Sequence, residues 1–148
     1  MKRNSFYRFI LVSLFLVTAC GTPLEDYQAK NEQEKEIKTT LVEFTKARND
    51  FDVQKIASFL TDDCRINFPG HSTVASKAGY VSTWKDSDIE TVGKCNFQNL
   101  ELSIKDEFVD AKTDCSQSII TPSIIFNFKM VRQNNRWLIS EWTNSMNF

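Results

Sequence analysis

The pattern of hydrophobic positions divides the chain into three parts. Apolar residues fill positions 9–17, close to the start. From about Glu34 to Arg48 they recur every three or four residues, which is the spacing of one face of an α-helix. From about Thr91 onward, apolar and polar residues alternate, which is typical of half-buried β-strands. The pattern therefore predicts helices first and strands last.

Three helices are expected in the first half of the domain. The first carries one apolar stripe, made of Ile37, Leu41, Phe44 and Ala47. The second covers 53–60, where Asp52 can cap the free backbone N–H groups and the acids after residue 60 mark the helix end. A strand over 64–68 stops at Pro69-Gly70, and a third helix is expected from about residue 72 to Trp84.

Four strands are expected after the helices, over about 91–104, 108–118, 123–132 and 137–143. Tight turns are predicted at 105–107 and 133–136. The apolar phase changes within the first strand, between Phe97 and Leu100, as it does at a β-bulge. Segregated helices and antiparallel strands define an α+β domain.

Two stretches resemble the NTF2-like family, which includes nuclear transport factor 2 and ketosteroid isomerase. One is residues 44–52 together with 56–63, and the other is residues 134–139. The resemblance covers nearly all of 34–148 and implies a cone, in which three N-terminal helices pack on a curved antiparallel sheet. It also implies that Trp137 is buried in the closing strand. Both stretches encode turns and packing rather than chemistry.

The start of the chain has the features of an export signal. Lys2, Arg3 and Arg8 precede the apolar run, which is too short to span a bilayer. The following residues, 17–20, read Val-Thr-Ala-Cys and resemble the lipobox of bacterial lipoproteins. The resemblance implies a signal peptide over 1–19 and a lipid-modified Cys20 that attaches the protein to a membrane of the cell envelope. The alternative is an ordinary secreted protein with an incidental thiol.

Composition narrows the class of partner. Without residues 1–19 the chain keeps 15 basic residues against 19 acidic ones, a formal net charge of −4. An acidic domain without a basic cluster is a poor binder of nucleic acid. Residues 20–33 are polar and acidic and are expected to form a flexible tether. Gly21 stands where an aspartate would retain a lipoprotein in the inner membrane, so the resemblance favours the outer membrane in a cell with two.

Three cysteines remain once Cys20 is assigned to lipid. Export implies an oxidising compartment, so one disulfide and one spare thiol are expected. Pairing the strands around the turn at 106–107 sets Cys115 opposite residue 98, and the inferred bulge shifts it to face Phe97. Cys95 and Cys115 are then diagonal neighbours, which favours a disulfide between them and leaves Cys64 buried and reduced. Three free thiols are the alternative.

Candidates for catalysis are few, and each has a simpler structural explanation. His71 follows a Pro-Gly turn and fits a solvated loop, while Asp52 fits a helix cap. Asp62 and Asp63 fit a helix end, and Asp114 fits an exposed position. No cysteine spacing suits a metal, and no glycine-rich loop suits a phosphate or a cofactor. No catalytic residue, metal or cofactor is therefore assigned.

Aromatic residues are the remaining signal. A ligand cavity of the domain is expected to be lined by Phe68, Tyr80, Trp84, Phe126, Phe128 and Trp142, unless these residues simply fill the core. The leading hypothesis is a lipid-anchored envelope protein whose domain binds a small apolar ligand or a protein partner without catalysis. The alternative is an NTF2-like isomerase, cyclase or dehydratase with an acid in its pocket. Family members also dimerise through the outer face of the sheet, so a homodimer is a further expectation.

The lipobox generates the first testable prediction. Replacing Cys20 with Ser removes the thiol that would carry the diacylglycerol, so the variant should take up no fatty acid. Growth with a clickable fatty acid followed by in-gel detection measures this, with Cys64→Ser as the matched control that should label like the unchanged protein. Equal labelling of the Cys20→Ser variant would show that Cys20 is not the lipidation site.

Overall fold

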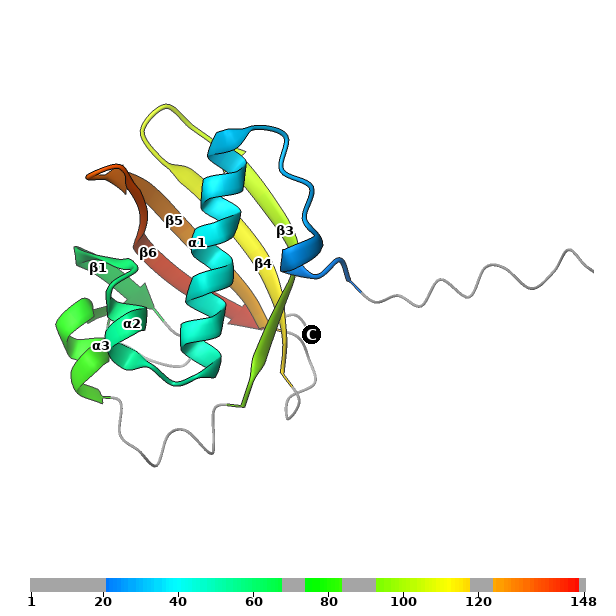
Figure 1. Ribbon diagram of the computed structural model, residues 1–148. Coiled ribbons are helices and arrows are strands. Elements are labelled where there is room, and N and C mark those ends of the chain that lie inside the picture. Colours follow the sequence, from blue (N-terminus) through cyan, green and yellow to red (C-terminus); the bar gives the residue numbers. More distant parts are fainter. Residues whose placement is uncertain (1–20, 68–73, 84–92, 118–123, 147–148) are drawn as a thin grey trace, which may run out of the picture.

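The computed structural model describes residues 21–67, 74–83, 93–117 and 124–146 (Figure 1). Several predictions fall outside these residues. They are the signal peptide over 1–19, lipidation at Cys20, the loop position of His71, and the cavity positions Phe68 and Trp84.

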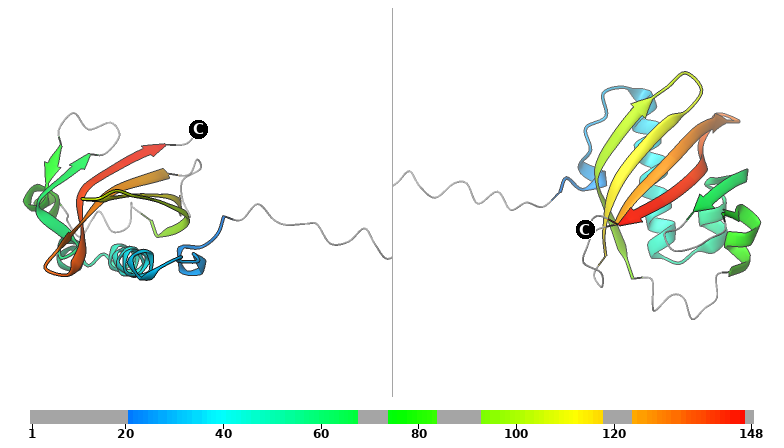
Figure 2. Two further views of the ribbon diagram at one scale, coloured as in Figure 1. Left: turned by 90° about the horizontal axis from the view of Figure 1, so that it is seen from above. Right: turned by 180° about the vertical axis from the view of Figure 1, so that it is seen from behind.

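The described chain forms helices packed on one curved, six-stranded sheet. In chain order the elements are η1 (Leu24–Asp26), α1 (Glu32–Asn49), α2 (Val53–Ala57), β1 (Leu60–Asn67), β2 (Ala75–Ser76), α3 (Lys77–Thr83), β3 (Cys95–Ile104), β4 (Val109–Gln117), β5 (Ile124–Gln133) and β6 (Arg136–Met146). The strand order in the sheet is β2-β1-β6-β5-β4-β3. Figure 2 shows that α1 lies along the concave side of the sheet, while no described helix covers the convex side. This is an α+β architecture, as predicted.

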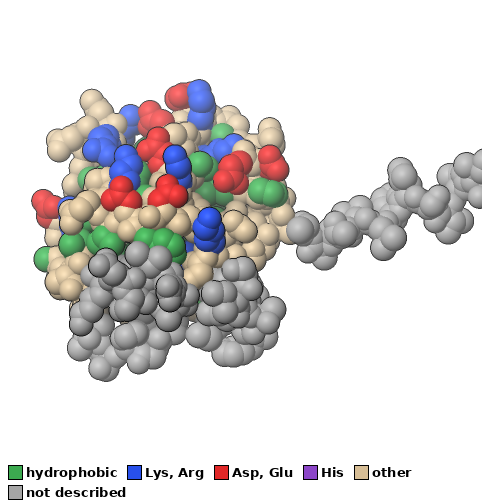
Figure 3. Space-filling view, turned by 60° about the horizontal axis from the view of Figure 1, so that its bottom comes forward, with side chains coloured by type: hydrophobic (Ala, Val, Ile, Leu, Met, Phe, Trp, Pro, Cys, Tyr) green, Lys and Arg blue, Asp and Glu red, His purple; other side chains and the backbone are tan. Residues whose placement is uncertain are grey.

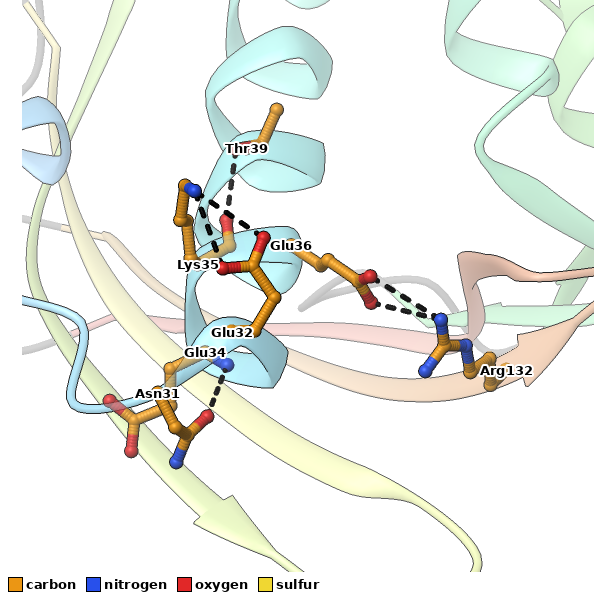
Figure 4. Close-up of polar contacts among 7 residues, drawn as sticks. All are labelled: Asn31, Glu32, Glu34, Lys35, Glu36, Thr39 and Arg132. Atoms are coloured by element: carbon orange, nitrogen blue, oxygen red, sulfur yellow. Dashed lines mark hydrogen bonds and ion pairs between the residues drawn. The ribbon is translucent and has the colours of Figure 1, made fainter.

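Helix α1 begins at a well-defined cap. The Asn31 side chain accepts a hydrogen bond from the backbone N–H of Glu34 at 2.9 Å (Figure 4). The Glu34 carboxylate in turn accepts hydrogen bonds from the backbone N–H of Lys30 and from the Tyr27 hydroxyl, both at 2.9 Å. These bonds, that of Lys30 foremost, lower the pKa of Glu34. The start of α1 is therefore held by reciprocal bonds to the segment before it.

The predicted apolar stripe of α1 faces the sheet and fills the core. Ile37, Leu41 and Phe44 are fully buried. The ring of Phe44 lies 5.5 Å from that of Phe128 and 5.3 Å from that of Trp142, both in edge-to-face geometry. These contacts place α1 across strands β5 and β6.

The hairpin of β5 and β6 matches its predicted turn. Gln133 pairs with Arg136, and Asn134 and Asn135 between them have φ values of 50° and 59°, as the type I′ turn requires. Trp137 follows and is 8% exposed, which confirms its predicted burial. Its indole Nε1 donates to the Glu36 carboxylate on α1 at 3.1 Å.

The Glu36 carboxylate also joins α1 to β5, the other strand of the hairpin. Arg132 on β5 lies 3.3 Å from Glu36, as Figure 4 shows. Glu36 thus bridges one helix and both strands of the hairpin, and it holds them in register.

The β3–β4 hairpin has the predicted register and bulge. Ile104 pairs with Val109 near the turn, and the register shifts by one residue between Gln98 and Glu101, so that Phe97 faces Cys115. The structure joins Cys95 to Cys115 by a disulfide, with their Cα atoms 5.6 Å apart. Cys64 is buried and reduced, the arrangement that the sequence favoured.

Two details of the predicted architecture are wrong. The three helices are not all N-terminal, because α3 follows β1 and β2 and has seven residues. Residues 75–76, expected inside that helix, pair instead with β1. The sheet is mixed rather than antiparallel, because β1 runs parallel to β6. The parallel pairing joins segments far apart along the chain, which local patterns do not report.

The second helix is also shorter than expected. It ends at Ala57, and β1 begins at Leu60, so Asp62 and Asp63 lie in a strand rather than at a helix end. The Asp52 side chain accepts a hydrogen bond from the backbone N–H of Lys55 at 2.9 Å, which confirms it as a helix cap.

The described part of the expected tether packs against the domain. Leu24 is 1% exposed and belongs to the core. The backbone N–H of Thr22 donates a hydrogen bond to the Asn99 side chain, and the backbone N–H of Asn99 donates one to the Thr22 carbonyl. A Cβ added at Gly21 would lie 2.6 Å from the amide nitrogen of the Asn99 side chain, so a larger residue would have to displace the ends of the Asn99 and Gln98 side chains. One buried leucine in a polar segment was too weak a signal to predict the docking.

The cysteines give the second prediction. In denatured, unreduced protein, iodoacetamide should alkylate Cys64 and neither Cys95 nor Cys115. In folded protein Cys64 should resist alkylation near neutral pH, because burial, foremost, raises the pKa of its thiol to about 12. Its reactivity should therefore rise only as the pH approaches that value. Peptide mapping by mass spectrometry reads out all three sites, and alkylation of Cys95 or Cys115 without reductant would contradict the disulfide.

Candidate functional site

A buried arginine lies within the aromatic interior of the domain. Arg48 is in the last turn of α1, four residues after Phe44 and therefore on the same face of the helix. It is 5% exposed. Its guanidinium carbon lies 5.7 Å from the centre of the Phe126 ring on β5, within range of a cation–π contact. The face of α1 that packs on the sheet therefore includes a charged side chain as well as the apolar stripe.

The guanidinium of Arg48 is not neutralised by the described residues. No hydrogen bond or ion pair joins it to any of them, and its Nη1 is a buried donor without a partner. Burial lowers the pKa of Arg48, and the hydroxyl of Tyr80 acts in the opposite direction. Buried polar groups in native proteins are normally hydrogen-bonded, and an unpaired buried charge is costly. Arg48 therefore needs a functional explanation.

Aromatic rings from three further elements surround this part of the interior. Tyr80 on α3 lies 5.4 Å from Trp142 on β6, and Trp142 lies 5.9 Å from Phe126, measured between ring centres. All three residues are buried. In Figure 1 helix α3 and the C-terminal end of α1 both lie in the lower part of the molecule. The candidate site is defined as Arg48, Tyr80, Phe126 and Trp142.

The structure brings together the described members of the predicted cavity lining. Tyr80, Phe126 and Trp142 belong to the candidate site, while Phe128 packs against Phe44 deeper in the core. Sequence reasoning missed Arg48, because a basic residue in the last turn of a helix normally interacts with the helix dipole in solvent. Its spacing of four from Phe44 was the signal that could have found it.

The acidic candidates do not enter the described core, although Asp62 and Asp63 lie in β1 and not at the predicted helix end. Asp62 is exposed and forms an ion pair with Lys77 at 2.9 Å. Asp63 is exposed, and Asp114 accepts a hydrogen bond from the Asn99 side chain. Among the described carboxylates only Glu34 is buried, and it lies in the first turn of α1, roughly 20 Å along the helix from Arg48. The described interior around Arg48 therefore holds a cation and no carboxylate.

Two surface grooves lie outside the candidate site. One, of about 620 Å³, runs between the N-terminal segment, α1 and β3, and Gly21, Thr45 and Phe97 are among its lining residues. The other, of about 280 Å³, lies between α1 and the β5–β6 turn and is lined largely by charged and polar side chains. In Figure 3 acidic and basic side chains are mixed over the described part of the face shown. No separate basic surface appears there.

Neither metal ligands nor a membrane-spanning helix is found in the part of the chain that the structure describes. No group of His, Cys, Asp and Glu side chains there could hold a metal ion. No helix there is both long and apolar enough to cross a membrane.

Comparison with known proteins supports the fold alone. No protein-family model matches the sequence, and a search of curated proteins finds no match. Among solved structures, an NTF2-like protein of unknown function from Pseudomonas putida aligns with a TM-score of 0.65 at 17% identity, covering 79% of this chain and 88% of that one. The architecture is therefore that of the NTF2-like fold, as the resemblance implied.

Two other similar structures carry functional names. One, from Novosphingobium aromaticivorans, is provisionally described as a scytalone dehydratase and aligns with a TM-score of 0.62 at 11% identity, covering 79% of this chain and 85% of that one. The other, ActVI-ORFA from Streptomyces coelicolor, aligns with a TM-score of 0.62 at 14% identity, covering 79% and 98%. At these identities the likeness extends to the fold and not to the activity.

The buried charge generates the third prediction. Replacing Arg48 with Met keeps most of the side-chain volume and removes an unpaired cation from the core. The free energy of unfolding should rise by about 1–4 kcal/mol in the absence of ligand. Thermal and urea unfolding measure this. The matched control is Arg65→Met on β1, where the side chain is exposed and stability should stay within about 0.5 kcal/mol. A marked loss of stability in the Arg48→Met variant would show that Arg48 has a structural role.

Proposed function

We propose that this protein is a lipid-anchored envelope protein whose NTF2-like domain binds a small ligand at the candidate site without chemically changing it. The observation that carries the proposal is the buried guanidinium of Arg48, which lies among aromatic rings and whose Nη1 has no hydrogen-bond partner among the described residues. Sites for small ligands combine apolar and aromatic walls with a few polar groups that fix the ligand's orientation. The candidate site has this composition.

The energetic argument favours a ligand over a purely structural role. A core arginine without a counter-ion lowers stability, whereas a residue such as methionine would fill similar space without that cost. Proteins keep such local conflicts mainly at functional sites. Arg48 is thus better explained by something that binds to it than by packing.

The enzymatic alternative has less support. An isomerase, cyclase or dehydratase of this fold needs an acid or base in the interior, and the described interior holds no buried carboxylate besides Glu34. The neighbour named as a dehydratase shares only 11% of its residues with this chain. We therefore propose binding rather than catalysis.

The anchoring part of the proposal comes from the sequence. Residues 17–20 supply the lipobox, and Gly21 favours the outer membrane in a cell with two membranes. A protein partner in the envelope and a homodimer are further predictions. The convex face that would form such a dimer is polar in part, since Lys129 pairs directly with Glu141 across β5 and β6. A dimer through this face would be held by polar contacts as well as apolar ones.

Tryptophan fluorine NMR tests ligand binding, and this is the fourth prediction. The chain has three tryptophans, Trp84, Trp137 and Trp142, which can be labelled as 5-fluorotryptophan and assigned from single Trp→Phe variants. A panel of small aromatic compounds, neutral, cationic and anionic, is titrated into the full domain. A binder at the candidate site should shift the Trp142 resonance in a saturable way.

Trp137 is the internal control. It lies beside the β5–β6 turn, at the other end of β6 from Trp142, and its indole is held by Glu36. Its resonance should stay in place while that of Trp142 moves. A panel that leaves Trp142 unmoved, or that shifts Trp137 alone, would contradict ligand binding at this site.

A further inference from the structure

We propose that the ligand of the candidate site is a small organic acid with an aromatic body, and that its single carboxylate pairs with Arg48. This inference rests on the proposed binding function and specifies the chemical class of the ligand. The juxtaposition that carries it is a guanidinium without a counter-ion among the described residues, close to three aromatic side chains.

Charge balance calls for an anion. The side chain of Arg48 is more than nine-tenths buried, and no described residue supplies a counter-charge or an acceptor for Nη1. Among the described residues Tyr80 alone opposes the effect of burial on the pKa of Arg48, and it carries no carboxylate that could pair with the guanidinium. A neutral ligand would add no counter-charge to those of the described residues, whereas a carboxylate would supply one.

The geometry of a guanidinium favours a carboxylate over other anions. Its N–H donors lie in one plane and match the two oxygens of a carboxylate as a fork. The guanidinium carbon lies 5.7 Å from the centre of the Phe126 ring, and Nη1 has no hydrogen-bond partner among the described residues, so this donor is available to a ligand. One arginine neutralises one negative charge, so a monoanion fits better than a phosphate dianion.

The surrounding rings favour an aromatic body. Phe126, Tyr80 and Trp142 come from three different elements and contact one another in edge-to-face and stacked arrangements. Aromatic pairs gain free energy beyond area burial in stacked and edge-to-face arrangements. An aromatic acid would therefore pair its carboxylate with Arg48 and pack its ring against these residues.

A matched pair of probes tests this inference, and this is the fifth prediction. We would titrate 2-naphthoate and its neutral amide, 2-naphthamide, into the full domain at neutral pH by isothermal calorimetry and by the Trp142 fluorine signal. Naphthoate should bind roughly 10- to 100-fold more tightly than naphthamide, as expected for one charged pair that is shielded from water.

Three variants locate the preference. Arg48→Gln removes the charge and should make the two probes bind alike. Arg48→Lys keeps the charge but loses the planar fork, so it should retain part of the preference. Arg65→Gln changes an exposed arginine of β1 and should bind as the unchanged protein does. Urea unfolding of each variant shows that it is folded.

The outcomes separate this inference from the proposed function. If both probes shift Trp142 with equal affinity, the site binds ligands but the assignment to organic acids is overturned. If the preference for naphthoate survives in the Arg48→Gln variant, the anion binds elsewhere and Arg48 is not its partner. If naphthamide and other neutral compounds bind while naphthoate does not, the inference also fails and the binding function stands. If no compound of either test shifts Trp142, both proposals fail.

Discussion

The packing of Phe44 against the concave face of the sheet is the contact on which the rest of the structure depends. Its ring meets those of Phe59, Phe97, Phe128 and Trp142, which come from four separate segments of the chain. A helix can place one large side chain at the centre of a sheet only if the sheet curves around it. The curvature, the position of α1 and the density of the core therefore have a common cause.

The same contact determines where Arg48 lies. In an α-helix residues four apart share a face, so burying Phe44 also carries Arg48 inward, toward Phe126 and away from solvent. The apolar stripe stabilises the fold, whereas Arg48 lowers its stability because a charged group is buried. Asn49, the next residue, holds this end of the helix in place, because its side chain exchanges two hydrogen bonds of 2.8 Å with the backbone of Cys95. The site thus sits on a rigid frame, as binding with defined geometry requires.

Local patterns predicted the elements whose partners are close in sequence. The stripe of α1, the Asn134-Asn135 turn and the β3–β4 register with its bulge each follow from spacing within about 20 residues. The parallel pairing of β1 with β6 joins residues more than 70 positions apart, and nothing in either strand encodes its direction. Leu24 and Arg48 were missed for a related reason. Leu24 is an apolar residue in a polar segment, and Arg48 is a charged residue at a helix end that is normally exposed. The burial of each depends on residues that are distant in sequence.

The docked N-terminal segment connects the proposed anchor with the proposed site. Gly21 lies against Asn99. A lipid on the preceding residue would therefore be attached about 3.8 Å, one Cα–Cα distance, from a residue that contacts the domain. Gly21 and Phe97 line the same groove, and the Phe97 ring lies 4.9 Å from Phe126, which carries the guanidinium of Arg48. Anchoring at this point would therefore hold one flank of the domain, and the rings behind it, close to the lipid headgroups.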